Sequence, residues 1–302
     1  MTDIAQIEEG ASRSQWWDVW DQFKTHKGAL IGAVFFILLV IVVFLGPYVW
    51  TLDYEATNAR ARNLPPSLEH PFGTDRIGRD FFAQMLKGGQ TSLAVGMAAM
   101  LLSLFFGTLV GVVAGYYKRL DGILMRFTDL FLALPLLPLL LVIIMLFRDP
   151  LRSAFGPESG IFILIVVVIG ITSWMQTARI VRGDVLALKE REFVLAARSI
   201  GTPNVKMILR HILPNVLSPI MVSATLGIAN AIITESALSF LGLGFPSDFP
   251  TWGRLLFDST DYLQQYPERV LLPGLAISLS VLSVNYIGDG LRDALDPRIR
   301  GR

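Results

Sequence analysis

The sequence has no cysteine and little charge. Without cysteine, the 302-residue chain contains no disulfide, no thiolate metal ligand and no cysteine nucleophile. Charged residues make up 17% of the chain, against about 25% in ordinary soluble proteins, and the formal net charge is +1. A protein that binds nucleic acid usually carries a basic face that displaces counterions. The composition therefore argues against nucleic acid as a partner.

Sequence motifs that bind nucleotides or metals are absent as well. The dipeptide Gly-Lys does not occur, so the chain has no phosphate-binding loop of the P-loop type. Its three histidines, His26, His70 and His211, lie far apart and form no HExxH pair on one helical face. We therefore expect the chain to be non-catalytic and to bind neither a cofactor nor a metal by itself.

Long apolar runs dominate the rest of the sequence. Hydrophobic residues make up 53% of the chain, and the mean hydropathy is +0.54. Crossing the hydrocarbon core of a membrane takes about 20 mostly apolar residues. We predict an all-α, polytopic membrane protein whose six transmembrane helices cover residues 29–50, 91–115, 130–147, 161–181, 216–241 and 271–287.

Lysine and arginine are unevenly distributed between the segments that connect these runs. If the N-terminus lies inside the cell, the inner segments carry 17 of the 26 basic residues. Basic residues concentrate on the cytoplasmic side of membrane proteins, so both termini are predicted to be cytoplasmic. The first run is too long for a secretory signal and is followed by Trp50 at an interface position, which indicates a retained anchor.

The distribution of apolar runs divides the chain into parts. They are a cytoplasmic N-terminal segment (1–28), a first transmembrane anchor (29–50), an outer loop (51–88), a main transmembrane domain (89–290) with a cytoplasmic inner loop (188–214), and a cytoplasmic tail (291–302). In the N-terminal segment, the spacing of Trp16, Trp20 and Phe23 predicts a short amphipathic helix at the membrane surface. A solvated tail is the alternative.

Two outer loops are long enough to carry a function of their own. In the first, Asp75, Arg79 and Asp80 are expected to pair with one another and to hold the loop against the helices, and direct contact with a solute is the alternative. The second, residues 245–269, is rich in aromatic side chains, among them Trp252. We interpret it either as an aromatic belt at the membrane surface or as a lip that docks a partner.

The inner loop is a charged, helix-forming segment between two apolar runs. Residues 190–200 favour a helix, Gly201 is suited to end it in the left-handed conformation, and the Thr-Pro pair at 202–203 fits the N-cap and first position of a second helix. Ala196 and Ala197 are small enough for another surface to approach closely. The loop is either a docking surface for a soluble partner or a solvated linker.

The spacing of residues in this loop resembles the coupling loop of permeases from binding-protein-dependent ABC importers. That signature has two alanines, a glycine after three further residues, and a Leu-Pro pair after eleven more. The resemblance implies that the residues that couple to an ATPase are Glu192, Ala196, Ala197, Arg198, Gly201, Leu213 and Pro214. Leu195 stands where the family usually has glutamate, and Glu192, one helical turn earlier, is the candidate substitute.

Four further stretches resemble the C-type permeases of oligopeptide and dipeptide importers. They are FGTDRIGRD at 72–80, RHILPN at 210–215, ESALSFLGLG at 235–244 and GDGLRDALDPR at 288–298. The resemblance implies a type I ABC importer permease fold in the cell inner membrane. Its implied partners are a second homologous permease subunit, two cytoplasmic ATPase subunits that bind ATP and Mg, an extracytoplasmic solute-binding protein and membrane lipid. The implied function is ATP-driven import of peptides or related small solutes.

Glu235 is the notable ionisable residue inside a predicted span. A charged carboxylate there costs about 2.5–3.5 kcal/mol on insertion scales, so it should face the interior of the helix bundle. Together with Ser236 and Ser239, it either lines the solute path or forms a polar contact between helices. An ion-coupled secondary transporter that uses Glu235 as a proton site is the alternative function, and an intramembrane enzyme is a second. The small number of ionisable residues within the spans disfavours both.

Overall fold

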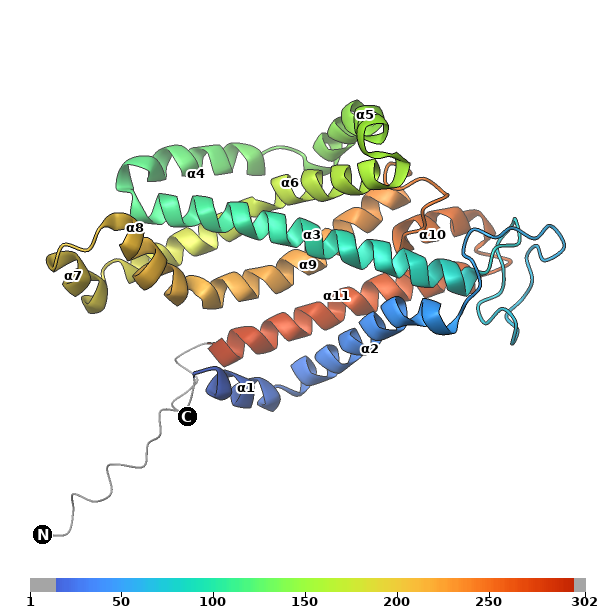
Figure 1. Ribbon diagram of the computed structural model, residues 1–302, viewed down its shortest axis with the longest axis horizontal. Helices are drawn as coiled ribbons and strands as arrows, with labels where there is room; N and C mark the ends of the chain where they lie inside the picture. Colours follow the sequence, from blue (N-terminus) through green and yellow to red (C-terminus); the bar gives the residue numbers. More distant parts are fainter. Residues whose placement is uncertain (1–14, 296–302) are drawn as a thin grey trace, which may run out of the picture.

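The computed structural model describes residues 15–295, and this part of the chain is helical apart from its loops and one isolated β-bridge in the first outer loop (Figure 1). The expected all-α fold is confirmed. The beginning of the N-terminal segment and the end of the cytoplasmic tail, including the last residues of the GDGLRDALDPR motif, are not described. Outside the described part lie residues 1–14 and 296–302 and the side chains of Gln15, Trp16 and Asp18.

Long helices make up most of the molecule. In chain order the α-helices are α1 (Gln15–Thr25), α2 (Lys27–Val49), α3 (Phe81–Tyr116), α4 (Lys118–Leu132), α5 (Leu136–Phe155), α6 (Pro157–Leu188), α7 (Glu192–Ser199), α8 (Asn204–Met207), α9 (Leu217–Phe240), α10 (Trp252–Ser259) and α11 (Glu268–Leu295). A π turn (Ile208–Ile212) and a 3₁₀ turn (Leu213–Val216) join α8 to α9, and a 3₁₀ turn (Thr260–Tyr262) follows α10. Figure 1 shows α3, α6, α9 and α11 running along the long axis, with α2 beside α11.

Five stretches in the described residues are long and apolar enough to cross a membrane: α2, α3, α6, the run Asn204–Phe240 that ends in α9, and α11. They coincide with five of the six predicted spans. Helix α3 begins ten residues earlier than the predicted span because Asp80 caps it, accepting a hydrogen bond from the Ala83 N–H at 2.6 Å.

The predicted span at 130–147 is wrong as a single straight helix. That stretch includes the break between α4 and α5, whose axes are bent by 85°. Pro135 is the N-cap of α5 and has an extended backbone (φ −68°, ψ 105°). Proline disfavours helical geometry at the residue before it and lacks the N–H that a continuing helix needs. The chain therefore has a sixth span only if this bent pair crosses the membrane as one broken element.

Helices α3 and α6 pack closely through a row of glycines. Gly107, Gly111 and Gly115 repeat every four residues on the face of α3 that meets α6. A Cβ atom at any of them would lie 2.6–2.7 Å from an atom of α6. Small residues at four-residue spacing allow helices to approach closely in membranes, where there is little hydrophobic force between them. The α3–α6 pair is thus the most closely associated helix pair of the described bundle.

Helix α1 lies against the N-terminal end of α2 and the C-terminal end of α11. Its Val19 and Phe23 are buried and pack with Ala29 and Ala294. Trp20, which was expected on the same apolar face as Phe23, stacks on that ring but stays 48% exposed. The face that packs onto the bundle is therefore formed by Val19 and Phe23, while Trp20 remains at the surface.

Candidate functional site

The inner loop lies at one end of the molecule, beyond the ends of α3 and α6, and the first outer loop and α10 lie at the other (Figure 1). It folds into two short helices, α7 and α8, as the sequence predicts, although α7 begins at Glu192 instead of residue 190. The chain then returns to α9 through the π turn and the 3₁₀ turn, and Leu213 and Pro214 begin the latter. All the residues assigned to coupling therefore lie in one segment, residues 189–216, which we call the elbow.

Gly201 ends α7 in the conformation expected from the sequence. Its φ of +80° is left-handed, its N–H donates to the Arg198 carbonyl at 3.0 Å, and the Thr202 N–H donates to the Ala197 carbonyl at 3.2 Å. These two bonds form a Schellman motif, which usually requires glycine. The expected N-cap at Thr202 is wrong by one residue, because Thr202 closes this motif and Pro203 takes the N-cap position of α8.

One face of α7 is buried in the helix bundle of this chain itself. Val194 is fully buried and Ala197 is 7% exposed, and both belong to a cluster with Val181 and Val185 of α6 and Met207 of α8. Residues three apart share a helix face. The interpretation that both alanines admit an outside surface is therefore wrong for Ala197, which packs inside the chain. Ala196 points outward and is exposed.

Two hydrogen bonds attach the elbow to the end of α3. The Tyr116 hydroxyl donates to Asn204 Oδ1 at 2.7 Å, and the Lys189 ammonium donates to the Gly115 carbonyl at 3.2 Å. Together with the buried cluster, these contacts make the elbow continuous with α3 and α6. Helices α7 and α8 are therefore anchored directly to the two central helices.

The rest of the elbow exposes several hydrophobic side chains. They are Phe193, Leu195, Ile200, Val205 and Leu209. Ile200, beside Gly201, is 84% exposed. Glu192 and Arg198 flank this surface, and neither forms an ion pair with any residue between 15 and 295. Exposed apolar surface rimmed by charge typically marks a protein-binding site.

Helix α4 is attached to α6 close to the elbow by ion pairs. Arg182 makes two hydrogen bonds to Asp121, at 2.5 and 2.7 Å, and Arg179 contacts Asp129 at 2.5 Å. Two-pronged arginine–carboxylate contacts are geometrically specific as well as strong. Sequence reasoning missed these pairs, because their members are about 50 to 60 residues apart in the chain.

Glu235 lies in the outer half of α9, away from the elbow, and is completely buried. Its carboxylate accepts hydrogen bonds from Ser92 of α3 at 3.0 Å and from Ser239 at 2.7 Å. The Ser92 oxygen in turn accepts the N–H of Trp252, at the start of α10, at 3.2 Å. This geometry favours a polar contact that joins three helices. The Ser236 hydroxyl is buried as well, and it has no hydrogen-bond partner among the described residues.

Trp252 belongs to the core of the outer end. It is 1% exposed, and its indole N–H donates to the Met85 carbonyl at 3.1 Å. Both interpretations of the second outer loop, a membrane belt and a docking lip, are therefore wrong for this residue. The reason is that the loop folds back as α10 and packs against α3, α9 and α11.

Of the ion pairs expected in the first outer loop, one forms and the other does not. Asp75 pairs with Arg79 at 2.7 Å, but Asp80 instead binds His70 at 2.8 Å and the Trp50 indole at 3.1 Å. Asp80 therefore does not pair with Arg79 as expected, and its carboxylate instead joins His70 and Trp50 to the N-terminus of α3.

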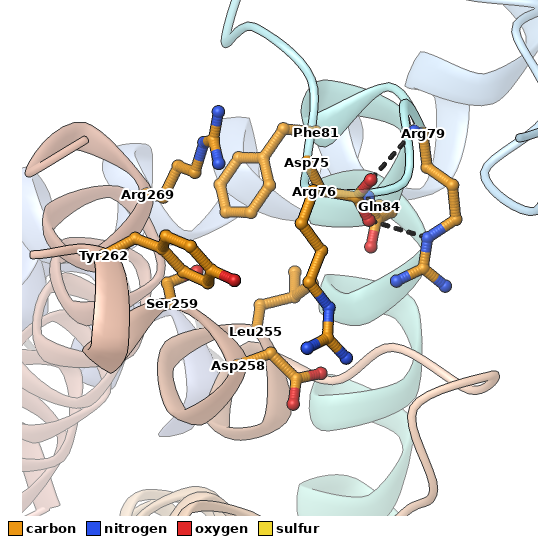
Figure 2. Close-up of a pocket in the computed structure, with 10 residues that line it drawn as sticks. All are labelled: Asp75, Arg76, Arg79, Phe81, Gln84, Leu255, Asp258, Ser259, Tyr262 and Arg269. Carbon is orange, nitrogen blue, oxygen red and sulfur yellow. Dashed lines mark hydrogen bonds and ion pairs between the residues drawn. The ribbon is translucent and has the colours of Figure 1, made fainter. Parts of the chain in front are cut away.

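The same loop meets α10 and α11 around a small cavity of about 30 Å³ (Figure 2). Buried Arg269 stacks on Tyr266 with its guanidinium 3.9 Å from the ring centre, and it donates to Asn63 of the loop at 2.8 Å. Arg79 reaches the Ser247 carbonyl at 3.3 Å. These contacts hold the outer loops to the helix ends.

Comparison with known proteins places this architecture in a family. Residues 103–301 match the family described as binding-protein-dependent transport system inner membrane component. The chain belongs to this permease family. Residues 14–66 also match the N-terminal transmembrane domain of oligopeptide transport permease C. The protein is thus a multi-pass inner-membrane permease and a non-catalytic subunit of its transport system.

Individual relatives match the permease over nearly its full length. It is 40% identical over 288 residues to the dipeptide transport system permease protein DppC of Alkalihalophilus pseudofirmus, covering 95% of this chain and 91% of the relative. It is 38% identical over 290 residues to the oligopeptide transport system permease protein OppC of Bacillus subtilis, covering 96% and 92%. The OppC protein of Haemophilus influenzae is 37% identical over 291 residues, covering 95% and 90%.

Sequence reasoning missed two residues that lie in the helices between the elbow and the outer loops. Gln176 of α6 and Asn230 of α9 line the same groove and are both exposed. A carboxamide in an otherwise apolar run was the available signal. That both side chains are exposed, and are therefore available to bind another molecule, is visible only in the folded permease.

Replacing Glu235 with leucine is expected to lower the free energy of unfolding of the purified complex by about 1–3 kcal/mol. The hydroxyls of Ser92 and Ser239 would lose their buried acceptor. Glu235→Gln, which keeps an acceptor oxygen, should lose less, and thermal unfolding in detergent measures both. Equal losses in the two variants would contradict a hydrogen-bonding role.

Proposed function

We propose that this permease imports di- or oligopeptides, forms the translocation path with a second homologous permease subunit, and receives its driving force from two cytoplasmic ATPase subunits that dock on the elbow. The observation that carries this proposal is the two-sided elbow. One face of α7 is buried against α6 through Val194 and Ala197, while the remaining surface of the helix, including Phe193 and Leu195, is exposed. An element of this kind can transmit a movement of the ATPase subunits to the transmembrane helices.

The chemistry of the cycle lies in the partner subunits. The ATPases bind ATP and Mg and hydrolyse the nucleotide, while an extracytoplasmic binding protein delivers the solute to the outer loops. A ligand shifts a conformational equilibrium only by its preference between states. ATP and the loaded binding protein must therefore both favour the same outward-open state of the permease, and hydrolysis then releases it.

Peptides are the proposed solutes because relatives of 37–40% identity are named dipeptide and oligopeptide permeases. An ion-coupled secondary transporter that uses Glu235 is the weaker alternative, since Glu235 is bonded between helices and completely buried. Uptake into proteoliposomes should stop without ATP and persist when the proton gradient is collapsed. The reverse result would support the ion-coupled function.

The proposed orientation, with both termini and the elbow in the cytoplasm, can be tested at the elbow and the first outer loop with single cysteines, because the natural chain has none. Ile200 and Leu68 are 84% and 98% exposed, on the elbow and in the first outer loop respectively. A membrane-impermeant thiol reagent should label Leu68→Cys in intact cells and Ile200→Cys only in inverted vesicles. In the assembled complex, a crosslinker at Ile200→Cys should capture an ATPase subunit, and one at Leu68→Cys should not.

Failure of the Ile200→Cys crosslink in an active complex would contradict the docking of an ATPase on the elbow. Labelling of both cysteines from the same side would contradict the proposed orientation. The two outcomes are independent, so each part of the proposal can fail separately.

A further inference from the structure

Helices α6 and α9 share an open groove beneath the α4–α5 bend. The groove has a volume of about 300 Å³, and a hollow of about 50 Å³ continues from it along the same helices. Ser173, Gln176 and Asn230 line both. A volume of this order lies at the lower end of the range for small-molecule sites.

The two carboxamides of this groove are exposed where the helices are otherwise apolar. Gln176 and Asn230 are the only exposed asparagine or glutamine residues in α2, α3, α6, α9 and α11. Within residues 15–295, neither side chain has a hydrogen-bond partner. By contrast, half-buried Gln90 of α3 donates to the Val43 carbonyl at 3.1 Å. The groove amides are thus left with their full hydrogen-bonding capacity.

Both residues lie deep within their spans. Gln176 is twelve residues from the inner end of α6, and Asn230 is thirteen residues from the inner start of α9, which corresponds to about 18 and 20 Å along the axes. A carboxamide that faces hydrocarbon without a partner costs several kcal/mol. This face of the permease must therefore meet either polar protein surface or a passing polar solute.

The chemistry of the lining selects between kinds of solute. The groove contains no ionisable side chain, and its polar members are threonine, serine, glutamine and asparagine. A carboxamide both donates and accepts hydrogen bonds, as a peptide bond does. The Thr234 hydroxyl already donates to the backbone carbonyl of Asn230 at 2.7 Å, and this bond leaves the Asn230 side chain free. The two carboxamides are therefore the main groups available to a solute.

We propose that Gln176 and Asn230 form a solute-binding site in the middle of the membrane, which binds main-chain amide groups of a peptide and not its side chains or terminal charges. This inference rests on the proposed function as a peptide permease. An uncharged site that reads only the peptide backbone holds every peptide weakly. It therefore permits passage of different sequences while selection stays with the binding protein.

The test uses the reconstituted complex of both permeases, the ATPases and the binding protein, with alanine dipeptides to pentapeptides as probes. Gln176→Leu and Asn230→Leu should each raise the KM for uptake about three- to ten-fold, which is the effect of losing one neutral hydrogen bond. The double variant should lose more. Asn230→Gln, which keeps the carboxamide, should stay within about two-fold of the natural protein.

Asn285→Leu is the matched control, because Asn285 is a half-buried carboxamide in α11 that lines neither the groove nor the hollow. It should leave the KM unchanged. ATP hydrolysis stimulated by the binding protein should persist in the groove variants. This distinguishes loss of the site from failure of the proposed function, in which uptake would not depend on ATP at all.

Three results would overturn the site. An unchanged KM in the double variant would show that the amides do not touch the solute. Reduced copurification of the second permease with an unchanged KM would show that they only join the subunits. Absence of uptake of every alanine peptide by the natural complex would overturn the assignment to peptide amides.

Discussion

Replacing Gly201 with valine is expected to reduce peptide uptake at least ten-fold while the ATPases continue to hydrolyse ATP. Gly201 has a φ of +80°, and a β-branched residue in that conformation is strained by about 1–3 kcal/mol. No atom lies within 4 Å of the position that a Cβ would occupy, so backbone geometry alone requires glycine. Relief of the strain would change the direction in which the chain leaves α7 and would displace Ile200 and α8 from the position in which the ATPase is proposed to dock. Uptake per ATP hydrolysed in proteoliposomes measures the effect.

Two other glycines provide matched controls for this change. Gly122 of α4 also has open space at its Cβ position but an ordinary helical backbone, so Gly122→Val should have little effect. Gly242 has a φ of +76° and open space at the outer end, so Gly242→Val introduces the same strain away from the elbow. It should lower stability comparably yet keep the ratio of uptake to hydrolysis. A normal ratio in Gly201→Val would show that the elbow is not the coupling element.

Ala197→Trp and Ala196→Trp are expected to fail in different ways, although the residues are neighbours. Ala197 is 7% exposed and packs with Val181 and Val185 of α6, so tryptophan would overpack the cluster by about 1–3 kcal/mol or more. It should displace α7, lower the unfolding temperature of the complex and abolish coupled uptake, while insertion into the membrane is retained. Ala196 faces outward, so its tryptophan variant should fold with unchanged stability.

The expected defect of Ala196→Trp is weaker assembly with the ATPase subunits, measured by copurification. The bulky side chain would obstruct the exposed face of α7 without disturbing the buried one. If both variants lost stability equally, or if Ala196→Trp assembled normally and only Ala197→Trp assembled poorly, the outward face would not be the docking surface. The two variants thus distinguish the packing of the elbow against α6 from its proposed contact with the ATPase subunits.

Local physical chemistry made much of the elbow predictable from the sequence. A glycine after a run of helix formers predicts the left-handed end of α7, because this conformation is strained for every other residue. Prediction of the N-cap at Thr202 failed because Thr202 and Pro203 were both suited to nearby positions, and only the closed Schellman motif decides between them. Which alanine faces outward could not be read either, since both are small and adjacent.

Composition and hydropathy by themselves determined that this protein is an all-helical membrane protein, because runs of about 20 apolar residues have no other stable environment. Tertiary structure alone decided that the third predicted span bends by 85°, that Glu235 bonds to Ser92 of α3, and that Gln176 and Asn230 face an open groove. The reason is that these features depend on contacts between residues far apart in the chain. Periodicity within one helix shows that a side chain is polar, but the partner it meets is set by how the helices pack.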